Sequence, residues 1–232
     1  MDLVPLRVAA GGGSIDGVPA AQLVAAGFTL LQRSAPLARA LAGRRSAILL
    51  PDSAHFLTAL AASDGRGAVL IPPSATASEV VSLLVSHRVG AVFTLAELAD
   101  RLLDAATPRV LLDDSPATAR VILTPMAGPQ EDRQVDREAD SHVDRRVDLG
   151  SHFGLELSGD DNAPGRDEEC VVIGGVVHTH RASLESARRV LAEPALLRAG
   201  TLLGTPGVFT EFDGLVRGLI APLMAGAHVT TR

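Results

Sequence analysis

The stretch Cys170-Val-Val-Ile-Gly-Gly-Val-Val-His-Thr-His-Arg181 is the most informative part of this chain. Four apolar residues lead into the pair Gly174-Gly175, and a second short apolar run follows the pair. Polar residues then lead to Ala182, where the apolar spacing of a helix begins. The pattern predicts a strand over 170–173, a second strand or a bend of the first over 176–177, and a helix over 182–192.

Short apolar runs alternate with amphipathic segments on both sides of this stretch. Further strands are expected at 46–50, 68–71, 91–94, 109–112, 201–204 and 228–230. Further helices are expected at 20–42, which Pro36 would kink or divide, and at 54–62, 78–87, 95–105 and 214–223. Short connections between alternating strands and helices predict an α/β fold, with a mostly parallel sheet flanked by helices.

The composition divides the chain into four parts. Residues 1–18 are expected to be a flexible leader, because Gly11-Gly12-Gly13 follows no convincing strand and is no nucleotide fingerprint. Residues 19–125 form an α/β subdomain, and residues 170–232 form a second α/β segment. Residues 126–169 are rich in Asp, Arg, Gly and Ser and contain short near-repeats of Val-Asp-Arg, so they are expected to be a charged, disordered linker.

Charge and composition exclude several classes of function. A net charge of −6 and a pI near 5.6, with no clustered basic run, argue against nucleic acid as a partner. The single Cys170 excludes an internal disulfide, and the first residues carry no signal-peptide pattern. Arg217 and Pro222 interrupt the most apolar late stretch, so no membrane span is expected there. A cytoplasmic location is therefore expected.

Four segments, in this order, resemble a known family. They are Ser46-Ala-Ile-Leu-Leu-Pro-Asp-Ser-Ala-His-Phe-Leu-Thr-Ala-Leu60, Gly67-Ala-Val-Leu-Ile-Pro-Pro73, Gly175-Val-Val-His-Thr-His-Arg181 and Ala225-Gly-Ala-His-Val229. Together they are similar to the adenylate-forming (AMP-binding) enzymes: acyl-CoA synthetases, fatty acyl-AMP ligases and adenylation domains. The resemblance covers most of 30–124 and 170–229. It implies the N-terminal part of that family's large domain, present here in an incomplete form.

The resemblance implies a reaction and its cofactors. Family members use ATP and Mg²⁺ to convert a carboxylic acid, such as a fatty acid, to an acyl-adenylate, and then transfer it to the thiol of coenzyme A or pantetheine. In the family, a loop rich in Ser, Thr and Gly, followed by Pro-Lys-Gly, precedes the Gly-Val-x-x-Thr-His motif. Here Ile173 runs directly into Gly174, and the whole chain contains no lysine. The phosphate-binding loop therefore looks deleted, and the chain alone is expected to be inactive.

By the same resemblance, Gly174, Gly175, Thr179 and His180 are the remnant of the nucleotide loop. Glu211, Phe212 and Gly214 correspond to the border of the acyl pocket, with Glu211 at the position of a family histidine. No catalytic residue and no metal ligand is assigned. His178 and His180 are spaced for one face of a strand, but no third ligand follows at a useful spacing. Thr179 is equally well explained as a helix cap.

Two other interpretations stay open. Glu211 and Asp213 have the character of a pair of acids for hydrolysis, but nothing in the sequence positions a nucleophile beside them. The chain is alternatively a non-catalytic interaction remnant, one half of a split ligase, or a decayed product. Exposed edges of an incomplete sheet would then bind a complementary polypeptide or a second copy of the chain.

Overall fold

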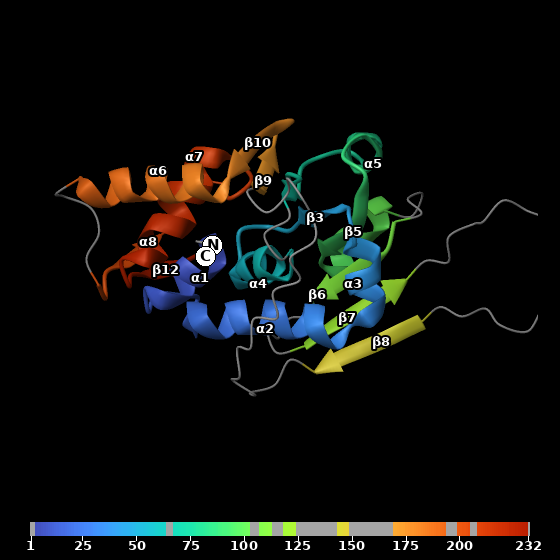
Figure 1. The fold of residues 1–232 in the computed structure, drawn as a ribbon, viewed down its shortest axis with the longest axis horizontal. Helices are drawn as coiled ribbons and strands as arrows, with labels where there is room; N and C mark the ends of the chain where they lie inside the picture. Colours follow the sequence, from blue (N-terminus) through green and yellow to red (C-terminus); the bar gives the residue numbers. More distant parts are fainter. Residues whose placement is uncertain are drawn as a thin grey trace, which may run out of the picture.

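The computed structural model describes residues 3–63, 67–102, 107–112, 118–123, 143–148, 169–193, 199–204 and 208–231 (Figure 1). The helices are α1 (Val4–Ala10), α2 (Ala20–Arg33), α3 (Ala35–Leu41), α4 (Ala54–Ala62), α5 (Ala77–Ser86), α6 (His180–Ala192), α7 (Phe212–Leu215) and α8 (Ala221–Met224), with the 3₁₀ turn η1 (Ala96–Leu102) and the π turn η2 (Val216–Ile220). The strands are β1 (Ser14–Ile15), β2 (Val18–Pro19), β3 (Arg45–Leu49), β4 (Ala68–Leu70), β5 (Val89–Thr94), β6 (Arg109–Leu112), β7 (Thr118–Leu123), β8 (Val143–Asp148), β9 (Glu169–Ile173), β10 (Val176–Thr179), β11 (Leu202–Gly204) and β12 (His228–Thr230).

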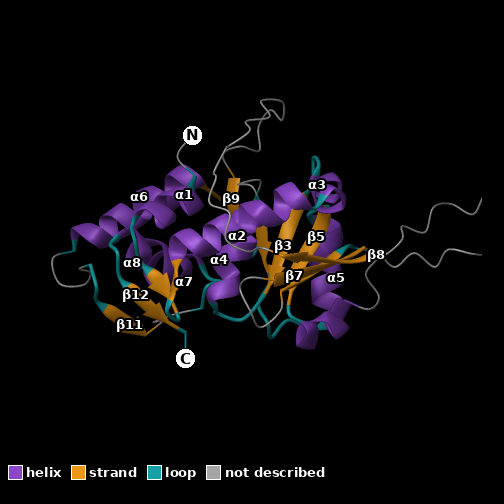
Figure 2. Ribbon diagram, turned by 90° about the horizontal axis from the view of Figure 1, so that it is seen from below, coloured by secondary structure: helices purple, strands orange, loops and turns teal. Residues whose placement is uncertain are grey.

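The larger sheet has eight strands in the order β10-β9-β4-β3-β5-β6-β7-β8. The five central strands, from β9 to β6, are all parallel, and antiparallel strands flank them at both edges. Helices lie on both faces of this sheet (Figure 2). The predicted α/β fold with a mostly parallel sheet is thus confirmed.

The strand side chains alternate between two buried layers. Ile48 and Leu50 pack into the larger core with α2 and α4, while Leu49 packs into the smaller core with α5 and η1. The alternation follows from the two-residue period of a strand. Helices α2 and α4 lie side by side, and Gly27 of α2 touches the backbone of α4 so closely that a Cβ there would overlap the carbonyl oxygen of Thr58.

A second, four-stranded sheet has the order β11-β12-β1-β2. Its strand β1 pairs in parallel with β12, so Ser14 lies opposite His228. The N-terminal residues therefore belong to the fold, and the expectation of a flexible leader over 1–18 is wrong for the described residues from Leu3 onward. The physical reason is burial, because Val4 and Val8 of α1 are fully enclosed.

Helix boundaries agree with the sequence where capping signals are strong. The segment 20–42 is divided at Ser34, whose hydroxyl accepts a hydrogen bond from the backbone N–H of Leu37 and so caps α3. Helix α5 begins with a full capping box formed by Thr76 and Glu79, which the sequence analysis had not recognised. The expected helix over 95–105 is a 3₁₀ turn, and the expected helix over 214–223 is a continuous run from α7 to α8 that contains a π turn.

The expected disordered linker over 126–169 is corrected in part. Val143–Asp148 forms β8, which pairs antiparallel with β7 so that Val147 lies opposite Ala119. Residues 124–142 and 149–168 lie outside the described residues. Asp113 and Asp114, which were considered for Mg²⁺, also lie outside them.

No helix in the described part is long and apolar enough to cross a membrane.

Candidate functional site

The carboxyl ends of the parallel strands form the candidate site. After β3 the chain turns to α4, which packs on the larger core, whereas after the adjacent strand β5 it turns to η1, which packs on the smaller core on the opposite face. Two neighbouring strands thus send their connections to opposite faces of the sheet. Ligands of open α/β sheets bind outside the carboxyl ends of the strands at such a switch point.

Asp52 lies in the loop that follows β3. Its side chain connects the carboxyl edge of the sheet to the C-terminal half of the chain. One carboxylate oxygen, Oδ1, accepts a hydrogen bond from the backbone N–H of Phe209 at 2.9 Å. The ring of Phe209 is fully buried and meets the edge of Phe56, with ring centroids 5.3 Å apart. Partial burial raises the pKa of Asp52, and the Phe209 hydrogen bond opposes that rise. Sequence reasoning missed this contact because it joins positions 157 residues apart.

Gly174 and Gly175 form the tight turn between β9 and β10. Val176 pairs with Ile173 in the antiparallel ladder, so the two glycines are the whole connection. Their φ angles are 56° and 82°, the left-handed pair that a two-residue type I′ hairpin requires. A Cβ added at either position would meet no other atom within 4 Å, so backbone conformation, not crowding, accounts for the glycines.

Thr179 and His180 are both engaged in the fold. The Thr179 hydroxyl accepts a hydrogen bond from the backbone N–H of Ala182 at 3.1 Å and caps α6. The buried His180 ring accepts a hydrogen bond at Nδ1 from the backbone N–H of Val4, also at 3.1 Å. The interpretation of Thr179 as a helix cap is confirmed, and His180 connects the start of α6 to the start of α1.

His178 and Phe212 bring the hairpin and the expected acyl-pocket border together. Their rings stack with centroids 3.9 Å apart and planes inclined by 10°. Partial burial lowers the pKa of His178 below its ordinary value, because burial disfavours the charged imidazolium. The described residues contain no group of three side chains suited to hold a metal ion. His178 is thus a stacking partner of Phe212, a role that its spacing from His180 did not suggest.

The other residues of the expected border differ in their exposure. Glu211 is exposed at the N-cap position of α7, and its side chain makes no capping hydrogen bond. Gly214 is buried, and a Cβ there would overlap the carbonyl oxygen of Val208, so close packing requires glycine at this position. Asp213 forms an ion pair with Arg217 at 3.0 Å. The structure therefore gives no support to Glu211 and Asp213 as a pair of acids, because Asp213 is already bonded to an arginine.

Comparisons with known proteins identify the fold. No protein-family model and no curated protein sequence matches the chain. Similar solved structures include a benzoate CoA ligase from Burkholderia xenovorans LB400 (16% identity, TM-score 0.65), which covers 99% of this chain over 45% of its own length. The N-terminal domain of FACL13 from Mycobacterium tuberculosis (18% identity, TM-score 0.61) covers 99% of this chain over 57% of its own length.

The nonribosomal peptide synthetase FmoA3, solved with α-methyl-L-serine-AMP bound, is a third similar structure. Its identity is 19% and its TM-score 0.63, and the match covers 98% of this chain and 23% of the synthetase. This chain thus spans between 23% and 57% of the three structures. At these levels of identity the likeness extends to the fold alone, and the chain has the fold of part of each of these three structures.

Proposed function

We propose that this protein is a relative of the acid-activating, adenylate-forming ligases that does not itself bind ATP. The fold it shares with a benzoate CoA ligase, and with a synthetase solved around an aminoacyl-AMP, supports the relationship. The reaction of such ligases is ATP-dependent activation of a carboxylic acid to an acyl-adenylate, followed by thioester formation. The four segments that resemble the family in sequence lie on β3–α4, β4, β10–α6 and β12, which supports the same assignment.

The observation that carries the proposal is the two-glycine turn between β9 and β10. A polyphosphate is bound by several backbone N–H groups that converge on it and by a nearby cation. Gly174 and Gly175 are the whole connection of an antiparallel hairpin, and two residues supply too few backbone N–H groups for a ring of donors. The chain contains no lysine to supply the usual ammonium group. The residues present therefore do not fit ATP with Mg²⁺, and no catalytic step is derived through that group.

The neighbours of the turn support the same conclusion. Thr179 uses its hydroxyl to cap α6, and His180 uses Nδ1 to bind the backbone of Val4. Both contacts are internal to the protein, so these atoms are not available to a nucleotide without loss of a fold contact. The exposed carboxylate of Glu211 also suits a border with solvent better than an apolar acyl pocket.

Acid-dependent exchange of pyrophosphate into ATP tests this function. The purified chain is assayed with Mg²⁺ and a panel of fatty, aromatic and amino acids, with the benzoate CoA ligase from Burkholderia xenovorans LB400 as the positive control. We expect exchange by the control and none above background by this chain. Acyl-adenylate formation by this chain with any acid of the panel would contradict the proposal.

A second candidate is a binding role for the lateral edge strand β10. Strand β10 lies at the end of the eight-stranded sheet, and its residues Val176 and Val177 are 59% and 43% exposed. An exposed apolar edge strand is a template for pairing with another chain, such as the complementary part of a ligase or a second copy. Sedimentation velocity over a range of concentrations tests self-pairing, and Val176→Thr with Val177→Thr should shift any dimer toward monomer.

A further inference from the structure

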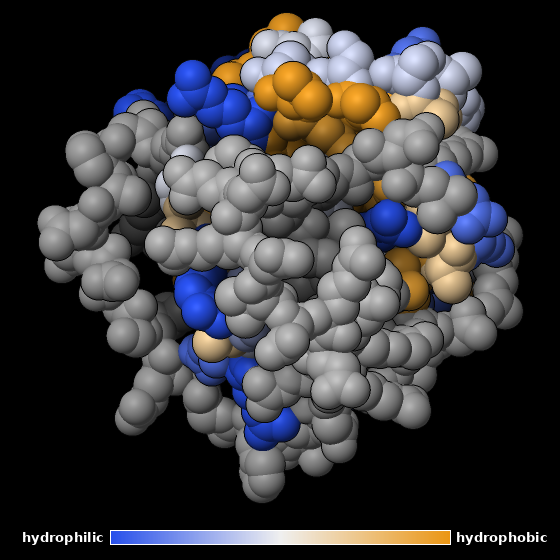
Figure 3. All heavy atoms as spheres, turned by 90° about the vertical axis from the view of Figure 1, so that its right-hand side faces the viewer, coloured by the Kyte–Doolittle hydropathy of each residue, from blue (hydrophilic) through white to orange (hydrophobic). Residues whose placement is uncertain are grey.

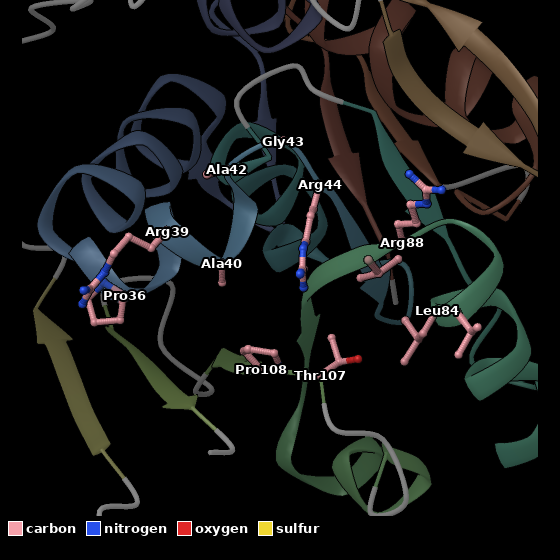
Figure 4. A pocket seen from close by; sticks show the side chains of 13 residues that line it. Pro36, Arg39, Ala40, Ala42, Gly43, Arg44, Leu84, Arg88, Thr107 and Pro108 are labelled. Carbon is pink, nitrogen blue, oxygen red and sulfur yellow. The ribbon is translucent and has the colours of Figure 1, made fainter. Parts of the chain in front are cut away.

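A cleft lies at the opposite edge of the sheet, where the parallel strands begin. Its volume is about 900 Å³, which suits a small organic ligand. The end of α3, the end of α5 and the residues before β6 line it (Figure 4). Because the carboxyl-edge site lies at the other ends of the same strands, this cleft is separate from it.

Arginine side chains give the cleft a positive charge. Arg39, Arg44 and Arg88 line it, and the lining contains no Asp or Glu among the described residues. All three arginines are exposed, and Figure 4 shows the Arg44 side chain extending into the middle of the cleft. Arg39 donates to the carbonyl oxygen of Ala35, but the Arg44 and Arg88 guanidinium groups make no hydrogen bond or ion pair within the described ranges.

Helix ends explain only part of this charge. The carboxyl ends of α3 and α5 each place roughly half a negative charge near the cleft, and basic residues often lie at such ends. Three guanidinium groups exceed the two half charges by about two positive charges. The cleft therefore remains suited to an anion, and a dianion matches the excess.

The backbone of Arg88 supplies a second, independent observation. Both helices that border the cleft are followed by a residue in the left-handed region, Gly43 after α3 and Arg88 after α5, with φ angles of 66° and 52°. Glycine adopts this conformation without strain, whereas an arginine does not. Arg88 is one of two non-glycine residues in the described part of the chain with a positive φ, the other being Asp16, and such strain is typical of functional positions.

Apolar residues line the cleft beside the arginines. Leu84 and Val85 of α5 line the cleft with Pro36 and Pro108, and Val85 is 73% exposed. The face of the molecule at the right of Figure 1 likewise carries hydrophobic residues beside strongly hydrophilic ones (Figure 3). A ligand with both an anionic group and a small apolar group would satisfy this combination.

We propose that this cleft binds a small organic phosphate ester. The phosphate dianion accepts hydrogen bonds from the guanidinium group of Arg44, which matches the geometry of phosphate oxygens, and the exposed Arg88 side chain turns toward it from the rim of the cleft. The apolar group of the ester packs against the exposed side chain of Val85, beside Pro36 and Pro108. This site is independent of the carboxyl edge and requires no metal ion.

The test uses 1-naphthyl phosphate as the probe and inorganic phosphate for comparison. The chain has no Trp and no Tyr, so the naphthyl fluorescence is free of protein background. The variants are Arg44→Gln and Arg88→Gly, with Arg188→Gln as the matched control, because Arg188 is an exposed arginine on α6 outside the cleft lining. Titrations without metal ions give the dissociation constants, and thermal melts report the fold.

We expect the wild type to bind naphthyl phosphate with a Kd below about 1 mM, and more tightly than inorganic phosphate. Arg44→Gln and Arg88→Gly should each weaken binding by about tenfold or more. Arg88→Gly should also raise the melting temperature by about 2–4 °C, which separates lost binding from lost stability. Arg188→Gln should leave binding unchanged.

Three results would overturn the proposal. The first is no saturable binding by the wild type below about 1 mM. The second is equal weakening by the Arg188→Gln control, which would show a general effect of net charge. The third is unchanged binding in Arg44→Gln, which would place the probe elsewhere.

Discussion

The imidazole of His180 accepts a hydrogen bond from the backbone N–H of Val4, across 176 residues of sequence. Val4 is the first residue of α1, and Leu3, at the N-cap position of this helix, gives no side-chain cap. His180 therefore satisfies one of the donors that a helix start leaves open. A histidine that resembles a family nucleotide motif thus serves here to hold the N-terminal helix onto α6.

Replacement of His180 tests this contact. His180→Ala leaves the buried Val4 N–H without an acceptor and should lower the free energy of unfolding by about 1–3 kcal/mol. His180→Asn places an oxygen close to the position of Nδ1 and should recover part of the loss. Chemical denaturation of the three proteins measures both values. Equal losses in the two variants would show that the hydrogen bond is not what matters at this position.

Gly174 offers a matched pair of substitutions. Asparagine is favoured at the first position of a type I′ turn, and the space around Gly174 is open, so Gly174→Asn should change stability by less than about 0.5 kcal/mol. Gly174→Val places a branched side chain at a φ of 56° and should cost about 1–2 kcal/mol. Thermal melts compare the two variants. Similar stability for both would argue against a strained two-residue turn.

Asp52 gives a prediction about pH. Partial burial raises the pKa of this carboxyl above its ordinary value of 3.8, so the folded state binds the proton more tightly than the unfolded state. The stability due to this proton is fully present below pH 3.8 and is lost as the pH rises through the raised pKa. Asp52→Asn keeps an oxygen for the Phe209 N–H but removes this loss.

Melting curves from about pH 4 to pH 7 compare the two proteins. Asp52→Asn should gain stability relative to the wild type as the pH rises, and should be at least as stable at neutral pH. A difference that does not change with pH, or one that favours the wild type at neutral pH, would contradict the assigned cause of the shift.

The pair Arg45 and Glu169 links the start of β3 to the start of β9 across the intervening strand β4. The Arg45 Nε and Nη2 atoms donate to Glu169 Oε2 and Oε1, both at 2.9 Å, and the side chains are only 20% and 17% exposed. Glu169→Gln should lower stability by about 1–2 kcal/mol. The control is Glu185→Gln, which breaks an ion pair whose arginine is 88% exposed and should have a much smaller effect on stability, because solvent screens the pair. Equal costs in urea titrations would contradict this ranking.

Local signals predicted most of the central fold. The apolar runs of β3, β4, β5, β6 and β9 are strands that are buried on both faces, and such runs stand out in a sequence. Helix α4 and strand β12 were predicted with their observed bounds, because Pro51 and the glycine at 226 punctuate the chain before them. The division at Ser34 followed from the position of Pro36.

Long-range contacts decided what the sequence could not predict. Strand β1 is two residues long, which is too short to show the apolar–polar alternation of a strand. Its partner β12 lies at the other end of the chain. The capping box at Thr76 was missed because the helix was expected to begin at Ser78. At the candidate site, the glycine turn was visible in the sequence, whereas the Asp52 contact with Phe209 and the stack of His178 on Phe212 arise only from tertiary packing.

The two-glycine turn between β9 and β10 should not bind the polyphosphate of ATP. Isothermal titration calorimetry of the Arg44→Gln variant with ATP and Mg²⁺ tests it most directly, since that variant removes the cleft arginine that would also attract phosphate. We expect no saturable binding of ATP with a Kd below about 1 mM. Saturable binding below that limit, with protein NMR shifts at Gly174 and Gly175, would contradict it.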